Sequence, residues 1–167
     1  ATPNETILND VTHNSGLDFK HVENRFIDFK MQRLLHYQLS RLGGMLSKAD
    51  VNKDGNDDVF FGGASGQSGA LFLGQDDGTF RKAPAQPWEQ DAACEDISSA
   101  FFDADGDGDV DLYVVSGGSE FIAGAPLYQD RLYVNNGTGV FTKTQEAIPA
   151  ETTSGSSVAA ADYDKDG

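Results

Sequence analysis

Five aspartates alternate with small residues in the stretch 103–111, which reads D-A-D-G-D-G-D-V-D. Carboxylates this close together repel one another unless a cation lies among them. The stretch contains no Cys or His, and a set of ligands made only of oxygen favours a hard divalent ion. Ca²⁺ accepts a crowd of oxygen ligands, whereas Mg²⁺ tends to keep several waters. The stretch therefore predicts a calcium-binding loop rather than a solvated acidic turn.

The spacing distinguishes this loop from an EF-hand. Position twelve counted from Asp103 is Val114, where an EF-hand has a Glu followed by a helix. The residues after the loop are β-branched and aromatic, which predicts a strand. Gly108 permits the sharp reversal that wraps the chain around an ion. The predicted ligands are the side chains of Asp103, Asp105, Asp107 and Asp111, together with the backbone carbonyl of Asp109.

The same pattern occurs three times, beginning at residues 50, 103 and 162. In the first loop the corresponding ligands are Asp50, Asn52, Asp54, the carbonyl of Asn56, and Asp58. In the third loop they are Asp162, Asp164 and Asp166, and the sequence stops at Gly167 before position nine. Regular recurrence of one spacing is typical of a repeat protein.

The elements that must position these loops also repeat. An apolar strand enters each of the first two loops, a second strand leaves it toward a Gly-rich turn, and a hairpin follows. The hairpins turn at residues 76–78 and 135–139. About four strands in a unit of roughly 55 residues predict an all-β repeat protein, a partial β-propeller of four-stranded blades. A two-sheet β-sandwich is the alternative.

This pattern divides the chain into a lead-in at 1–43, a first repeat at 44–95, a second at 96–155 and the start of a third at 156–167. Two blades and the start of a third cannot close a propeller, so we expect a fragment of a longer protein. Trp88 and Phe121 are expected to fill the space between blades.

The lead-in shows weaker patterns. Residues 17–23 alternate between apolar and polar, which predicts one or two short strands. In residues 29–42 the apolar side chains recur at three- and four-residue steps, which predicts a short amphipathic helix. Those apolar residues are Met31, Leu34, Leu35, Leu39 and Leu42.

Composition narrows the function classes. The formal net charge is −15, which argues against nucleic acid and against anionic membrane surfaces, because both need basic patches. No apolar run approaches the roughly 20 residues of a membrane-spanning helix. The single Cys94 excludes an internal disulfide and is expected to be a small buried apolar residue.

The motif D-x-[DN]-x-D-G-x-x-D, followed by an apolar strand and Gly-Gly, occurs at residues 50–63 and 103–118. It resembles the FG-GAP/VCBS repeat, which builds the propeller of integrin α subunits. The hairpin at 132–141 and the opening at 9–19 are similar to those of bacterial relatives with ASPIC/UnbV-type modules. The resemblance covers residues 44–167 well and the first 43 weakly. It implies that the family's metal ligands fall on the loop residues named above, and that the protein binds and scaffolds.

Two functions are compatible with the sequence. The first is a non-enzymatic extracellular calcium-binding module, at the cell surface, in the periplasm or secreted, that displays loops to a protein or glycan partner. The alternative is a fragment of a polysaccharide-acting propeller enzyme. His13, His21 and His36 precede the first repeat without metal-ligand spacing, so they favour no catalytic site. We also expect self-association through open sheet edges.

Overall fold

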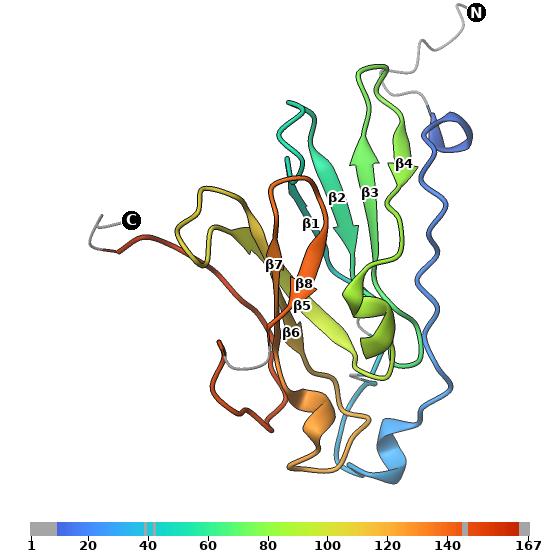
Figure 1. The fold of residues 1–167 in the computed structure, drawn as a ribbon. Coiled ribbons are helices and arrows are strands. Elements are labelled where there is room, and N and C mark those ends of the chain that lie inside the picture. The colour runs from blue at the N-terminus through green and yellow to red at the C-terminus, as the bar shows by residue number, and fades with distance from the viewer. Residues whose placement is uncertain (1–9, 39, 42, 145–146, 164–167) are drawn as a thin grey trace, which may run out of the picture.

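A computed structural model of the chain describes residues 10–38, 40–41, 43–144 and 147–163. These residues form two four-stranded antiparallel sheets, ordered β1-β2-β3-β4 and β5-β6-β7-β8 (Figure 1). Strands that are neighbours in the sequence are also neighbours in the sheet, so each sheet is a meander. The strands are β1 (Leu46–Ala49), β2 (Asp58–Phe61), β3 (Ala70–Gly74), β4 (Phe80–Lys82), β5 (Asp96–Phe102), β6 (Asp111–Ser116), β7 (Arg131–Asn135) and β8 (Phe141–Lys143).

In the described residues the helical content consists of four short 3-10 turns: η1 (Thr12–Asn14), η2 (Asp28–Lys30), η3 (Pro87–Asp91) and η4 (Pro126–Tyr128). The prediction of an all-β repeat fold is therefore confirmed. The repeat boundaries at 43/44, 95/96 and 155/156 stay predictions. No helix in the described part of the chain is long and apolar enough to cross a membrane.

The two hairpins form as predicted, and the same backbone hydrogen bond closes both turns. The N–H of Gln75 donates to the carbonyl of Thr79 (2.9 Å), and the N–H of Asn136 donates to the carbonyl of Val140 (3.2 Å). At each turn an Asp or Asn side chain accepts from the N–H two residues later, at 3.0 Å in both cases. Local turn chemistry therefore fixes both hairpins.

The core lies between the two sheets and is centred on Trp88. This side chain is 2% exposed and belongs to η3, in the linker between β4 and β5. Its ring packs against Phe60 of the first sheet (5.2 Å between centroids) and against Tyr133 and Phe141 of the second (5.4 Å each). Trp88 thus fills the space between the sheets, as predicted. Phe121 does not, because its ring packs on Tyr128 of η4.

The prediction of short strands at residues 17–23 is wrong. Residues 17–23 run extended beside the first sheet (Figure 1), but they form no strand. The N–H of Phe80 donates to the carbonyl of Ser15 (2.7 Å), and the N–H of Val22 donates to Oε1 of Gln67 (2.9 Å). Phe19 stacks on Phe61 of β2. Phe19 thus packs on the outer face of the sheet, whereas Val22 is exposed, and the segment does not join the ladder.

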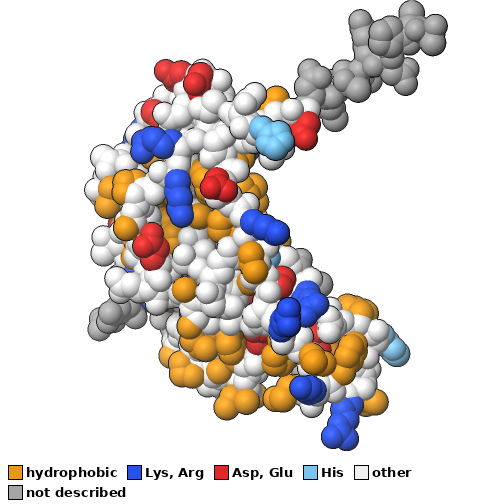
Figure 2. Space-filling model, turned by 90° about the vertical axis from the view of Figure 1, so that its right-hand side faces the viewer, with side chains coloured by type: hydrophobic (Ala, Val, Ile, Leu, Met, Phe, Trp, Pro, Cys, Tyr) orange, Lys and Arg blue, Asp and Glu red, His pale blue; other side chains and the backbone are white. Residues whose placement is uncertain are grey.

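The helix predicted over residues 29–42 is also wrong. Its described residues contain only the end of η2 followed by turns, and Leu39 and Leu42 lie outside the described residues. Met31 and Leu34 are exposed, and Figure 2 shows apolar side chains beside Lys and Arg at this end of the molecule. Helical spacing stabilises a short helix only when its apolar face packs on a core, and here no core covers it.

The start of the third repeat forms no strand in the described residues. Residues 156–163 have no strand, and Gly155 makes a single parallel bridge with Gly117. The N–H of Val158 donates to Oγ of Ser98 in β5 (3.3 Å). The segment thus donates a hydrogen bond to a side chain of β5 without pairing with it as a strand.

Candidate metal centre

The first two Asp-rich loops have the same place in the two sheets. Residues 50–58 join β1 to β2, and residues 103–111 join β5 to β6. Both loops lie at the same end of the sheets as the two hairpin turns (Figure 1). We call them loop one and loop two.

The two loops also share a backbone conformation. At position four, Lys53 has φ +59° and Gly106 has φ +80°. At position six, Gly55 and Gly108 have φ +89° and +84°. Left-handed backbone at these two positions turns the chain around a common centre, and Gly adopts it without steric cost. Lys53 is the one non-Gly residue of the described chain with positive φ.

Position one closes each loop through its carboxylate. Asp50 accepts hydrogen bonds from the N–H groups of Asp54 (3.1 Å) and Gly55 (2.9 Å). Asp103 accepts from Gly106 (2.8 Å) and Gly108 (2.9 Å). Through these bonds the backbone of each loop folds around the carboxylate at position one.

Position nine fastens each loop to its sheet. Asp58 and Asp111 have no exposed surface. Each accepts one N–H from position two of its own loop at 2.9 Å, and one from the end of the third strand of its sheet at 2.8 Å. Burial raises the pKa of both carboxyls, the backbone N–H groups oppose that rise, and the other loop carboxylates add to it.

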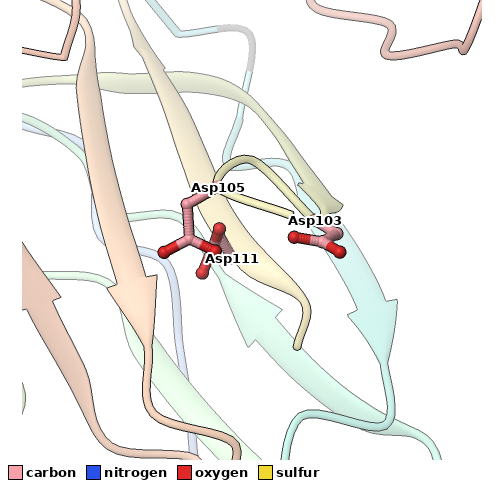
Figure 3. Close-up of side chains that lie close together, drawn as sticks. All are labelled: Asp103, Asp105 and Asp111. Atoms are coloured by element: carbon pink, nitrogen blue, oxygen red, sulfur yellow. The ribbon is translucent and has the colours of Figure 1, made fainter. Parts of the chain in front are cut away.

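Loop two brings three predicted ligands together. The side chains of Asp103, Asp105 and Asp111 each place a carboxylate oxygen within 4.8 Å of the others (Figure 3). Asp103 and Asp105 are exposed, while Asp111 is buried at the base of the loop. Three hard anionic oxygens on one side of a tight loop fit Ca²⁺ by the chemistry of the donors.

The other two predicted positions of loop two lie outside this group. Oδ1 of Asp107 accepts the N–H of Asp109 at 2.8 Å. The carboxylate of Asp109 pairs with Lys53 of loop one. The pairing turns the Asp109 side chain toward the first sheet, and the predicted role of its carbonyl stays a prediction.

Loop one lacks such a group among the described residues. At position three loop one has the amide of Asn52 where loop two has a carboxylate, and this amide donates to Oδ2 of Asp54 (2.8 Å). The side chain of Asn56 donates to Asp76 of the neighbouring hairpin (3.0 Å). Asp57, which lies between ligand positions, is exposed and pairs with Lys48.

The third loop is described only at its start. Asp162 is exposed, and Asp164 and Asp166 lie outside the described residues. Their predicted role as ligands stays a prediction.

Two residues that sequence reasoning missed connect the loops across the sheets. The amide of Asn135, at the end of β7, donates to the carbonyls of Val51 in loop one (2.8 Å) and Val110 in loop two (3.1 Å). Asn135 is 2% exposed. The second is Lys53, through its ion pair with Asp109. The sequence offered one sign of the role of Asn135, namely a polar residue at the end of a buried strand.

Comparison with known proteins agrees with this architecture. Residues 50–114 and 116–167 each match the family model of the FG-GAP-like repeat. Comparisons with curated proteins and with solved structures gave no match.

Proposed function

Because the chain belongs to the FG-GAP-like repeat family, we propose that it is a non-enzymatic calcium-binding module whose ions stabilise the loops of its blades. The observation that carries this proposal is the convergence of Asp103, Asp105 and Asp111 within 4.8 Å. When bound, Ca²⁺ would neutralise their mutual repulsion. Asp111 would then hold an ion, the backbone of its own loop and β7 in one cluster.

The calcium in this proposal is structural. The loop residues of the unfolded chain are not preassembled, so the free energy of ion binding adds to the free energy of folding. An ion that binds only the folded state adds about 2.7 kcal/mol when its concentration is a hundred times its Kd. The pairing of Asp109 with Lys53 would extend this effect from loop two to the first sheet.

The cellular role follows from the kind of site. Exposed calcium loops with few pre-formed ligands suit the roughly millimolar calcium of extracellular fluids. We therefore place the module at the cell surface, in the periplasm or among secreted proteins. A protein or glycan would bind the loops that connect the strands, in the manner of the integrin-like propellers that the repeat resembles.

Thermal unfolding of the 167-residue chain in calcium and in EGTA tests the proposal. We expect calcium to raise the Tm of the wild type by several degrees, since about 1 kcal/mol shifts Tm by roughly 2–4 °C in a domain of this size. Asp103→Asn should lose most of the rise in Tm that calcium binding to loop two provides. Asp57→Asn is the control, because it removes the same charge from an exposed site between ligand positions. Equal Tm values with and without calcium would refute a structural ion.

The two loops are expected to differ in affinity. Loop two offers four side-chain carboxylates, whereas loop one offers three and an amide. A higher charge of the ligand set strengthens calcium binding, so loop two should bind more tightly. Calorimetric titration of Asp50→Asn and Asp103→Asn separates the two sites. A tighter loop one would contradict the ranking.

A further inference from the structure

Glu95 is a buried acid without a partner. It precedes β5, is 5% exposed, and its Oε2 has no hydrogen-bond partner. No Lys or Arg of the described chain pairs with it. A buried carboxyl group without a donor is stable only when it is protonated or when a cation compensates for the lost water, so Glu95 is a candidate ligand for a cation.

The carboxylate of Glu95 lies against the chain just after β6. Gly118 has φ +87°, and a Cβ at this residue would overlap Oε2 of Glu95. The next two residues reach the lead-in: Ser119 donates to Asp28, and Glu120 accepts from the amide of Asn24. Three segments that are far apart in sequence therefore meet around Glu95.

The surroundings of Glu95 are rich in acceptors. Oδ1 of Asn24 is buried and has no partner, like Oε2 of Glu95. Glu23 lies nearby and accepts from the N–H of Gly43 (3.2 Å), while its other contact is Nε2 of His21 (3.1 Å). The negative charges of Glu120, Glu23 and Asp28 all act on Glu95. The described chain has no Lys or Arg paired with Glu95 or with these three carboxylates, and the one ionisable partner is His21 beside Glu23.

We propose that Glu95, Glu120 and the amide oxygen of Asn24 bind a divalent cation of the calcium class. The site lies at the end of the sheets opposite to the loops, since β5 begins and β6 ends there (Figure 1). All its donors are oxygens, which excludes the softer metals that select thiolate or imidazole.

The donors here are more widely spaced than in loop two. Within the described chain, only Asp103, Asp105 and Asp111 bring three acidic oxygens within 4.8 Å of one another. An ion at Glu95 therefore uses fewer carboxylates and completes its shell with the Asn24 amide oxygen and water, which Ca²⁺ accommodates in its large, flexible shell. Such an ion would fasten the lead-in to the second sheet.

Calcium titration of the full 167-residue chain tests this site. Glu95→Gln keeps the shape of the side chain and removes its charge. We expect it to fold, because it removes an unpaired buried charge, and to bind one calcium fewer than the wild type in calorimetry. Glu89→Gln, which neutralises an exposed Glu of η3, is the matched control and should bind as the wild type does. An unchanged stoichiometry in Glu95→Gln would overturn the proposal.

Hydrogen exchange gives a local readout of the same site. Calcium should slow amide exchange in residues 23–28 and 117–121 of the wild type, and this protection should vanish in Glu95→Gln and weaken in Asn24→Ala. Protection confined to residues 103–111 would overturn the proposal.

The test separates this site from the loops. Asp103→Asn should abolish the loop-two ion and leave the protection of residues 117–121 unchanged. If Asp103→Asn removes all calcium binding, the inference fails and the proposed function stands. If only Glu95→Gln changes calcium binding, the inference stands and calcium binding by loop two fails. Titration with Mg²⁺ should give weaker protection, since Mg²⁺ dehydrates reluctantly.

Discussion

A buried aspartate at position nine of each loop accepts two backbone N–H groups and is also predicted to bind an ion. The two oxygens of Asp111 accept from the N–H groups of Ala104 and Asn135, and Asp58 makes the equivalent contacts. A carboxylate has about four lone-pair sites, so two N–H contacts leave room for a metal. The residue therefore stabilises the loop with and without calcium.

We predict that Asp111→Asn lowers stability even in EGTA. The Asn side chain has one acceptor where Asp111 has two, and its NH₂ faces a backbone donor. The unsatisfied N–H should cost about 1–3 kcal/mol in the free energy of unfolding, measured with urea. Asp107→Asn is the control, because Asp107 is exposed and its Oδ1 contact with Asp109 survives the change. Equal losses in the two variants would contradict a special role for position nine.

Glu95 should make stability depend on pH when calcium is absent. Burial and the charges of Glu120, Glu23, Asp28 and Asp96 raise its pKa from 4.5 to about 8. The pKa of Glu95 in the folded protein lies above its pKa in the unfolded chain. The contribution of protonated Glu95 to the free energy of unfolding is therefore complete below about pH 4.5 and is lost as the pH rises through about 8.

Urea unfolding of the wild type and Glu95→Gln in EDTA at several pH values measures this effect. Between pH 4.5 and 8 the free energy of unfolding of Glu95→Gln should rise relative to that of the wild type. One pKa unit corresponds to about 1.4 kcal/mol, so the gap should reach at most about 4–5 kcal/mol and then stay constant. A gap that does not change with pH would show that Glu95 is not strained by its charge.

At the scale of elements, η3 connects the two sheets and places Trp88 between them. The neighbouring Gln86 also crosses the interface: its Nε2 donates to the carbonyl of Gly139 (2.9 Å) and its Oε1 accepts the N–H of Phe141 (3.2 Å). A linker thus supplies both apolar and polar contacts between the blades.

Trp88→Ala should therefore destabilise the interface between blades. Removing a large buried aromatic side chain costs about 3–5 kcal/mol, because the cavity between Phe60, Tyr133 and Phe141 cannot collapse fully. Phe29→Ala, at a ring that is 41% exposed, should change stability little. Urea unfolding followed by circular dichroism measures both, and a loss below about 1 kcal/mol in Trp88→Ala would contradict the central role of the ring.

The elements that sequence reasoning predicted correctly depend on neighbours within a few residues. The hairpin at 75–79 and the turn at Gly108 follow from local turn chemistry, and the repeat of that chemistry indicated the architecture. The apolar residues in 29–42 have helical spacing, but this spacing does not show whether a hydrophobic core is present for the apolar face of a helix to pack on. Leu34 is 94% exposed, so the pattern had no partner and no helix formed.

The candidate sites divide in the same way. The spacing of Asp103, Asp105 and Asp111 is local, so these residues could be predicted as a group, and the structure brings them together. The surroundings of Glu95 could not be predicted, because Asn24 and Glu120 are 96 residues apart and meet only through the packing of the lead-in on the sheets. Long-range contact between non-repeating segments leaves no periodic signal.

Over the whole molecule, the lead-in connects the two ends of the blades. It contacts β4 near the hairpin end through Ser15 and Phe80, and it reaches Glu120 at the opposite end through Asn24. If both proposed ion sites are filled, calcium would act at the loop end of the second sheet and at the opposite end, where Asn24 of the lead-in contacts Glu120. The formal charge of −15 would then be partly neutralised where the acids are densest.

The second sheet ends in β8, and no strand of the described chain pairs with its outer side. An unpaired edge offers N–H and carbonyl groups to another chain, so we predict self-association that grows with protein concentration. Thr142→Lys places a charge on this exposed edge and should shift sedimentation-velocity profiles toward the monomer. Thr152→Lys adds the same charge at an exposed position outside any strand and should leave association unchanged. A wild type that sediments as a monomer at every concentration would show that the edge is protected in solution.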